Sequence, residues 1–424
     1  MLITSKNLKN KLLNNCIHRE IIIRFPDDDI ADITGSNIVE DSFELTQSLF
    51  EGSEFKLGGG VASQLVVQVI DIENELNNKR INVFLSCTYL SDILYPSETL
   101  YPRSTLYSGR SENNYEIQLF SGTIDSSLRQ RNRQIKEIIA YDDLYRMSNI
   151  QCKDNFTGYV QYTMTKSDVT LSEFRDYLIE RFELTIDRDV NKTYLTDLNI
   201  DTVLKTTLET ATEAANDKIT LLDLLRSCYE LNSSFLVCGN DGTFKAVKLY
   251  QRSGENYENE KVDVAEIIPS YQDLEFEEYI TRPINRIRFE YNKNKKFDYG
   301  YSTGKESWYL SDNELTKCLT GADELVNNFF QRTEQGVAHN YIFYDLYSYR
   351  PFSATLFDYW WLEPGDRVQI QTGYTDTEIV DSFIFSKKIK GINGMSVTIK
   401  AGGTEFLGKD EITDGSELST NKLG

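Results

Sequence analysis

Short runs that alternate apolar and polar residues dominate the first 150 positions of the chain. "REIIIRF", "SFELTQSLF", "SQLVVQVID", "RINVFLSC" and "KEIIAYDDLYRM" are rich in Ile, Val, Phe and Tyr, and polar turns separate them. A period of two residues is typical of a strand that buries one face. The pattern therefore predicts a mainly β domain over residues 1–148.

The pattern changes to a helical period in the middle of the chain. In "DVTLSEFRDYLIERFEL", Thr170 and Glu173 have the spacing of a capping box, and an apolar stripe follows them. "KITLLDLLRSCYELNSSFLV" repeats this arrangement with Thr220 and Asp223. Its stripe consists of Leu221, Leu224, Leu225 and Cys228. The two matching starts predict paired helices, or coincide only because helix starts share capping chemistry.

Two strands are predicted directly after the second helix. In "SSFLVCGNDGTFKAVKL", Asn240-Asp241-Gly242 has the composition of a hairpin turn. Asp241 is therefore interpreted as a turn former and not as a catalytic acid. Together with the helices, this hairpin predicts a smaller α+β domain over residues 149–252.

Strands return in the last third of the chain, in "INRIRFEY", "NYIFYDLYSYRPFSATLFDYWW", "EIVDSFIFSKKIKG" and "MSVTIKAGG". Between the first two of these, Ser311 and Glu314 have capping-box spacing and precede the longest apolar stripe of the chain. Such a stripe is most simply core packing. The sequence predicts a second β domain with an inserted helix over residues 253–408, and a flexible tail over residues 409–424.

One stretch, "WWLEPGDRVQIQTG", could be the lip of a substrate pocket or the corner of a β structure. Pro364 and Gly365 suit the central positions of a tight turn, and Asp366 can cap it. Trp360 and Trp361 are expected to be packing or interface aromatics. The alternation after the turn points Val368, Ile370 and Thr372 to one face of an antiparallel strand. These features favour the corner.

The triple glycine Gly58 to Gly60 suggests a phosphate-binding loop at first sight. No Lys-Ser or Lys-Thr pair follows it, and the next residues alternate as a strand instead of opening a helix. We therefore expect a bend between strands.

The chain offers little that points to catalysis. His18 and His339 are far apart in sequence, and no GxSxG motif is present. "PDDDIADITG" resembles a weak calcium loop with Asp27, Asp29 and Asp32, but it lacks the 12-residue pattern that ends in Glu. Paired carboxylates for glycoside hydrolysis stay open, since only geometry would select a pair among 66 acidic residues. We predict no catalytic, cofactor-binding or metal-binding residue.

The charge of the chain argues against two classes of partner. A net charge of −21 opposes a DNA-binding surface and binding to an anionic membrane. One basic run, "RQRNRQIKE" at residues 129–137, is either the polar end of a strand or a contact for an acidic partner.

Cysteine spacing and hydropathy indicate the cellular compartment in which the chain is made. The six cysteines have no CxxC or metal-ligand spacing, which predicts reduced, mostly buried thiols and synthesis in a cytosol. They are Cys16, Cys87, Cys152, Cys228, Cys238 and Cys318. No apolar run reaches the roughly 20 residues that span a bilayer, and the N-terminus has no secretory pattern. We expect no membrane anchor.

The order of the segments resembles tail hub proteins of phages and prophages of Gram-positive bacteria. "TGSNIVEDSFELTQSLFEGSEFKLGGGVASQLVVQVID" is similar to the opening of the first hub barrel, and "RQIKEIIAYDDLYRM" to a later strand. "VTLSEFRDYLIERF" and "ITLLDLLRSCYELNSSFLVCGNDGTFKAVKL" resemble the two helices and the hairpin of that family. "YRPFS", "EPGDRVQIQTG" and "IKGINGMSVTIKAGG" resemble its closing strands. These motifs cover most of residues 30–405.

The resemblance implies a fold and a structural role. It implies an α+β, mainly β chain in which two tube-protein-like β-barrel domains flank or interleave with a smaller α+β domain. Three copies would form a homotrimeric ring that adapts a sixfold tail tube to a threefold tip. The implied location is the tail or baseplate of a virion that is assembled in the cytoplasm of the bacterial host.

The resemblance also implies partners. These are the tail tube or distal tail protein, the tape-measure protein, and a spike or fibre protein. DNA would pass through the ring without specific binding, and we expect part of the negative charge to face this channel.

Two departures and two alternatives accompany the resemblance. Gly59-Gly60-Val61 stands where the family more often has Gly-Ser or Gly-Cys, and Asn232-Ser233-Ser234 replaces a usual glycine. Many family members continue into a hydrolase or fibre domain beyond the length of this chain, so the resemblance implies the hub alone. The alternatives are a tail-associated cell-wall hydrolase and a receptor-binding or carbohydrate-binding adhesin, the latter favoured by Trp and Tyr residues expected to be exposed.

Overall fold

The computed structural model describes most of the chain outside its middle region. The described residues are 5–52, 55–95, 107–129, 134–150, 169–170, 178, 199–200, 220–231, 233–253, 258–281, 284, 286–291, 295–300, 308–317, 348–372, 379–392 and 394–403. Within them the fold is α+β and mainly β, as the sequence predicted.

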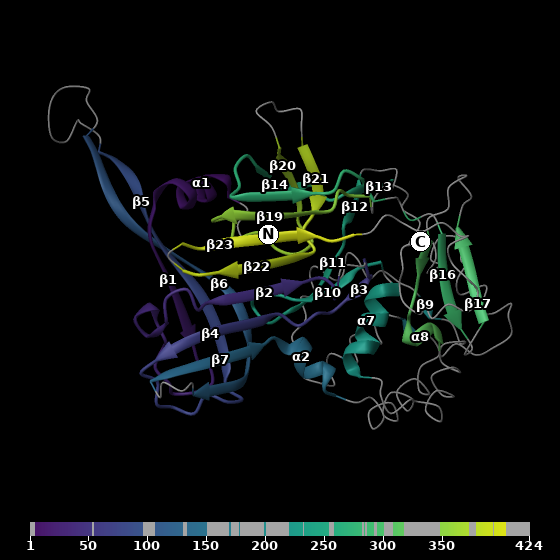
Figure 1. The fold of residues 1–424 in the computed structure, drawn as a ribbon, viewed down its shortest axis with the longest axis horizontal. Coiled ribbons are helices and arrows are strands. Elements are labelled where there is room, and N and C mark those ends of the chain that lie inside the picture. Colours follow the sequence, from purple (N-terminus) through teal and green to yellow (C-terminus); the bar gives the residue numbers. More distant parts are fainter. Residues whose placement is uncertain are drawn as a thin grey trace.

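A ten-stranded sheet joins the two ends of the chain. In spatial order its strands are β1 (Cys16–Arg24), β5 (Arg80–Tyr95), β6 (Tyr107–Arg129), β7 (Ile135–Tyr141), β4 (Gln64–Ile70), β2 (Glu44–Ser48), β22 (Ser386–Lys390), β23 (Ser396–Ala401), β19 (Phe352–Phe357) and β15 (Asp273–Phe276). Figure 1 shows the purple and blue strands of the N-terminal part continuing into the yellow and green strands of the C-terminal part. Every neighbouring pair in this sheet is antiparallel.

Smaller sheets surround the large one in the described residues. They are β11 (Phe244–Val247) with β10 (Phe235–Cys238) and β3 (Gly58–Gly59); β12 (Tyr250–Ser253) with β13 (Glu258–Lys261); β14 (Val264–Ile268) with β20 (Arg367–Gln371) and β21 (Ile379–Phe383); β17 (Lys295–Gly300) with β16 (Arg286–Tyr291) and β18 (Trp308–Leu310); and β8 (Val169–Thr170) with β9 (Asn199–Ile200). The described helical segments are α1 (Lys6–Asn15), η1 (Gly35–Asn37), α2 (Asp143–Ser148), α7 (Leu221–Leu231) and α8 (Glu314–Lys317).

The predicted alternation builds the core of the large sheet. Leu65, Val67 and Val69 of β4 are fully buried, and so are Ile138 and Ala140 of β7. The residues between them lie on the other face and are half-buried. Each large apolar side chain removed from water in this way contributes roughly 1.5–3 kcal/mol.

The sheet crosses the predicted boundary between the first and the last domain. β2 comes from residues 1–148 and β22 from residues 253–408, and they pair along their whole length. No closed barrel is found in the part of the chain that the structure describes. The domain limits at residues 148, 252 and 408 stay predictions, and the tail 409–424 lies outside the described residues.

The N-terminal region contains two helices that the sequence reading missed. Helix α1 begins after Ser5, whose hydroxyl accepts a hydrogen bond from the backbone N–H of Leu8 at 3.4 Å. The segment "KEIIAYDDLYRM" was expected to be a strand throughout, but the strand ends at Tyr141. Asp142 then caps α2 by accepting from the N–H of Leu144 at 3.0 Å, because a carboxylate at this position satisfies a free amide of the first turn.

The second predicted helix is confirmed. The N–H of Thr220 donates to Asp223 Oδ2 at 3.0 Å, and the N–H of Asp223 donates to the Thr220 hydroxyl at 3.3 Å. This is the reciprocal capping box that the sequence predicted. The whole predicted stripe of this helix is buried.

The first predicted helix lies outside the described residues, apart from Leu178, which is helical and buried. The repeat of two helices therefore stays a prediction.

The predicted capping box of Ser311 and Glu314 is wrong. Asn313 caps α8, since its side-chain oxygen accepts from the N–H of Leu315 and of Thr316 at 3.1 Å each. The Ser311 hydroxyl instead donates to the buried carboxylate of Glu230 at 2.9 Å. Burial raises the pKa of the Glu230 carboxyl and leaves its lone pairs without water. Hydrogen-bond donors such as the Ser311 hydroxyl therefore stabilise this carboxylate, while Asn313 already caps the helix.

In the part of the chain that the structure describes, no helix is both long enough and apolar enough to cross a membrane.

Candidate assembly surface

The large sheet contains the same four-stranded arrangement twice. In chain order the first unit is β2, β4, β6 and β7, and the second is β15, β19, β22 and β23. In both units the spatial order is third, fourth, second, first: β6-β7-β4-β2 and then β22-β23-β19-β15. The strand registers align the two units row by row. Ala140, Leu65 and Leu45 of the first unit match Ala401, Phe352 and Phe276 of the second. The sheet is therefore a side-by-side repeat of one unit.

The two units meet at the junction of β2 with β22. Leu45 of β2 lies opposite Ile389 of β22, and both side chains are fully buried. On the other face the Glu44 carboxylate accepts from the Lys388 ammonium at 2.7 Å. The junction thus combines an apolar inner row with an ion pair between an acidic first strand and a basic third strand.

Lys387 of this junction is buried, and the nearby carboxylates of Glu363 and Asp366 favour its charged form. Its ammonium donates to the carbonyl oxygens of Trp360 and Leu362 at 3.1 and 2.6 Å. Burial lowers its pKa to about 8, because removal from water disfavours the charged form.

The first strand of the second unit, β15, has an open edge. It pairs with β19 on one side, and no described strand covers its other side. Phe276 faces inward, opposite the buried Phe352, yet 42% of its surface is exposed, whereas the matching Leu45 is 0% exposed. This edge is acidic: Asp273, Glu275, Glu277 and Glu278 are all exposed.

The third strand of the first unit, β6, is open over its last residues. Its pairing with β5 ends at Thr123, while its pairing with β7 continues to Arg129. On the open side, the N–H of Ser127 donates to the side-chain oxygen of Asn77 at 2.8 Å. Leu128 is 62% exposed. The basic run that starts at Arg129 begins at this edge, at the polar end of a strand as predicted.

The polar face of the large sheet carries both signs of charge. Its ionisable residues include Glu44, Glu137, Asp273, Glu275, Lys388, Lys390 and Lys400. The remaining positions are mostly Ser, Thr and Gln, with some half-buried aliphatic residues. This face therefore carries carboxylates beside its lysines, and the expected negative charge of a channel stays a prediction.

The triple glycine joins the large sheet to helix α7. All three glycines have positive φ, and a Cβ at Gly58 would lie 2.6 Å from the carbonyl oxygen of Arg226. The N–H groups of Gly58 and Gly60 donate to the carbonyls of Ser234 and Leu236 at 2.9 Å each. These amides are therefore not available to a phosphate, and the expected bend is a two-residue strand parallel to β10.

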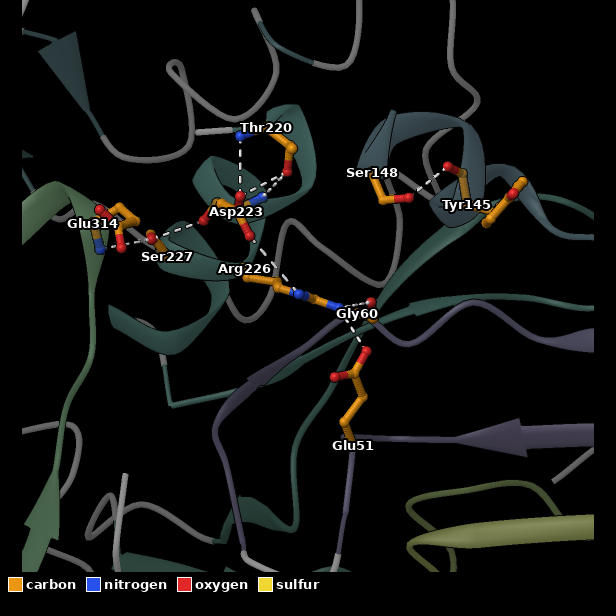
Figure 2. Close-up of polar contacts among 9 residues, drawn as sticks. All are labelled: Glu51, Gly60, Tyr145, Ser148, Thr220, Asp223, Arg226, Ser227 and Glu314. Atoms are coloured by element: carbon orange, nitrogen blue, oxygen red, sulfur yellow. Dashed lines mark hydrogen bonds and ion pairs between the residues drawn. The ribbon is translucent and has the colours of Figure 1, made fainter. Parts of the chain in front are cut away.

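Arg226 fixes the end of this glycine segment. Figure 2 shows its side chain reaching from α7 to the carbonyl oxygen of Gly60, with the second contact on Glu51. The distances are 2.7 Å to Gly60 and 3.9 Å to Glu51. On the far side of the helix, the Ser227 hydroxyl accepts from the N–H of Glu314 at 3.1 Å. Helix α7 therefore connects the glycine segment with α8.

The predicted turn at Pro364 is confirmed. Gly365 has φ +99°, and the Asp366 carboxylate accepts from the N–H of Glu363 at 2.9 Å. Val368 and Ile370 of the following strand are fully buried, but the strand pairs parallel with β14 as well as antiparallel with β21.

The turn also borders a cavity of about 450 Å³ between β10, β11 and β20. The cavity is lined by Gln47, Cys238, Asn240, Lys245, Pro364 and Arg367, among others. Burial raises the pKa of the Cys238 thiol well above its ordinary value, so this group stays protonated. The stretch "WWLEPGDRVQIQTG" is therefore a corner, and its turn also borders a cavity.

Of the two roles expected for Trp360 and Trp361, packing or interface aromatics, the structure shows packing. Trp360 and Trp361 are 1% and 0% exposed and pack edge to face with ring centroids 5.4 Å apart. Trp308, the third tryptophan of the chain, is 1% exposed. The rings are covered by the chain itself, which removes the exposed tryptophans that favoured an adhesin.

The remaining candidate residues do not form a site. Asp32 accepts from Arg24 at 3.4 Å, Asp28 pairs with Lys79, and no group of three or more His, Cys, Asp or Glu side chains is arranged to hold a metal among the described residues. Asp241 accepts from the N–H and the hydroxyl of Thr243, as a turn former does.

His18 lies in β1, and His339 falls outside the described residues. Cys16, Cys87, Cys228 and Cys238 are free thiols and three of them are buried, as predicted, while Cys152 and Cys318 are not described.

Comparisons with known proteins gave structural neighbours only. A scan of protein-family models found no match, and a search of curated proteins found none. A tail protein from Neisseria meningitidis MC58 is similar over 91% of this chain and 97% of its own, with 8% identity and a TM-score of 0.45. A 43 kDa tail protein of prophage MuSo2 from Shewanella oneidensis is similar over 90% and 97%, with 11% identity and a TM-score of 0.44.

A chain of a Francisella PdpA-VgrG complex is similar over 95% of this chain and 56% of its own, with 11% identity and a TM-score of 0.42. The first two of these neighbours are tail proteins, and the second belongs to a prophage. At such identities and scores the likeness transfers no partner and no activity to this chain.

Proposed function

We propose that this chain is a structural hub component of a phage tail or phage-tail-like particle and that it works as a ring of three copies. The observation that carries the proposal is the repeated four-stranded unit within one sheet. A chain with two equivalent units presents two similar positions around a ring axis. Three chains then present six, which is what a part between a sixfold tube and a threefold tip requires.

Each unit would belong to one of two barrel-like domains, 1–148 and 253–408, with residues 149–252 as the smaller α+β domain. Closed rings need a heterologous contact, in which one edge of a copy meets a different edge of the next. The two open edges described above are different and lie at the two ends of the eight repeated strands. This arrangement supports a ring.

The polar face of the sheet would line the channel. DNA slides without specific binding where no cluster of Lys and Arg traps its phosphates, and this face balances its few lysines with carboxylates. Part of the negative charge of the chain would then face the channel, together with these lysines. The tail tube or distal tail protein, the tape-measure protein, and a spike or fibre protein are the proposed neighbours.

The proposal is tested on tail particles from the cells that produce this protein. Gold-labelled antibody against the chain is expected to mark one end of each tail in electron micrographs. Label absent from particles would overturn the proposal. Release of soluble fragments from peptidoglycan by the pure protein would favour the hydrolase instead.

A further inference from the structure

The junction inside the chain provides a template for the contact between chains. Strand β2 is the first strand of its unit and pairs with β22, the third strand of the other unit. The second unit has its own first strand, β15, and the first unit has its own third strand, β6. Among the described residues, no strand pairs with the outer side of β15 or with the outer side of β6 beyond Ile124.

We propose that β15 of one copy pairs antiparallel with the open end of β6, residues 126–129, of the next copy, in the register by which β2 pairs with β22. This inference rests on the proposed function, because it names the contact that closes the ring. Row-by-row alignment places Glu277 opposite Leu128, as Thr46 lies opposite Lys388.

Apolar burial supports this contact. Phe276 and Leu128 are 42% and 62% exposed, and large apolar side chains at a strand edge are normally covered or replaced by charge. In the internal junction the residue that matches Phe276 is Leu45, which β22 covers completely. In the proposed register Phe276 lies opposite Arg129, and the neighbouring β6 would remove part of the ring from water.

Charge complementarity supports it independently. The β15 edge continues as Asp273, Glu275, Glu277 and Glu278, while β6 ends at the basic run that begins with Arg129. The internal junction has the same polarity, with Glu44 on the first strand and three lysines on β22. The opposite charges of the two edges favour their approach, and like charges oppose self-pairing of two β15 edges.

In the isolated chain the side chain of Asn77 accepts a hydrogen bond from the open edge of β6. Its side-chain oxygen takes the hydrogen bond of the Ser127 N–H, the group that a neighbouring strand would otherwise accept from. Asn77 is exposed and can move aside, so it satisfies the amide without blocking the edge.

Disulfide trapping tests the register. In the double variant Leu128→Cys with Glu277→Cys, paired positions of neighbouring copies come within the 7 Å that a disulfide spans. Within one chain they are separated by six strands, so a bond between them joins two copies. Mild oxidation is expected to give at least tenfold more cross-linked chain, on a denaturing gel without reductant, than either single variant.

A shifted pair is the matched control. Asp125→Cys with Glu277→Cys places an equally exposed thiol three residues along β6, about 10 Å from its partner and too far to bridge. Equal cross-linking of both pairs would overturn the register.

Charge reversal tests the same contact without thiols. Glu275→Lys with Glu277→Lys is expected to lower the association constant of the copies at least tenfold, and adding Arg129→Glu is expected to restore part of it. A wild-type trimer that gives no cross-link and ignores the reversal would overturn this contact and leave the hub proposal standing. A wild-type chain that is monomeric and absent from tail particles would overturn both.

Discussion

The two four-stranded units share their connectivity but differ in what covers their first strand. β2 has β22 beside it, and its inward-facing Leu45 is fully buried. β15 has no described strand on that side, and the matching Phe276 is 42% exposed. The same position in the same unit is thus a core residue in one case and an edge residue in the other. The difference teaches that the edge of the second unit has a partly exposed apolar ring, which Phe352 and the Arg350 guanidinium contact but no described strand covers.

The third strands differ in a second way. β22 is five residues long, whereas β6 is 23 residues long and extends with β5 into a hairpin that projects beyond the other strands (Figure 1). Lys387 of β22 is buried, and the matching Ser127 of β6 lies at an open edge. The repeat therefore conserves topology and not the local environment.

The largest expected effect is on folding stability, when the apolar side chain is shortened at the matching positions Leu45 and Phe276. Leu45→Ala is expected to lower the free energy of unfolding by about 2–5 kcal/mol, since it leaves a cavity at a closed junction. Phe276→Ala is expected to cost about 1 kcal/mol or less in the monomer, since the ring is partly in water. Urea unfolding of both variants at low protein concentration measures the two losses. Equal losses of unfolding free energy in the two variants would contradict the account that Leu45 is covered and Phe276 lies at an open edge.

The next effect depends on pH and is specific to the second unit. The pKa of Lys387 is lowered to about 8 when folded, while a lysine in the unfolded chain titrates near 10.4. The unfolded chain binds more protons between these values, so stability rises as pH increases from about 8 to about 10, by up to about 3 kcal/mol. Below about pH 8 Lys387 is protonated in both states, so this contribution to stability no longer changes with pH.

Two variants isolate this effect. Lys387→Met is expected to lose the rise, although it also removes the donor to two carbonyls. Lys388→Met changes the neighbouring lysine, whose side chain is 45% exposed, and is expected to keep the rise. Urea unfolding of each variant at pH 7.5 and 9.5 provides the measurement. The same slope in all three proteins would refute the role of Lys387.

The smallest effect concerns the ion pair of the closed junction. Glu44→Gln is expected to cost about 0.2–1 kcal/mol, because both side chains are partly in water and salt screens their attraction. Thermal unfolding at low and at high salt measures it, and the difference between variant and wild type is expected to shrink with salt. A loss that is larger and independent of salt would indicate a buried role for Glu44.

Much of the local structure could be predicted from the sequence. The alternation in β4 and β7, the turn at Pro364-Gly365 and the capping box of Thr220 and Asp223 depend on residues within a few positions of one another. Helix α1 was missed because "KNLKNKLLNN" has too few apolar residues for a clear stripe. Ser311 was assigned to the wrong role because its partner, Glu230, is 81 positions away.

The assembly surface could be predicted only in part. The basic run at Arg129 was recognised as a possible contact, but its acidic counterpart at Asp273 to Glu278 is distant in sequence and was not. The sequence around Trp360 and Trp361 also did not decide whether they are buried, because an aromatic pair occurs both in cores and at interfaces. The topological repeat has no signal in the residues themselves and required the strand order.

The mass of the wild-type protein in solution, measured by light scattering over a range of concentrations, tests the central claim most directly. The account predicts a species with three times the mass of one chain that does not grow further, because a heterologous contact closes after three copies. Glu275→Lys with Glu277→Lys is expected to shift that species towards single chains. A wild-type protein that stays a single chain at every concentration, or that grows without limit, would contradict the account.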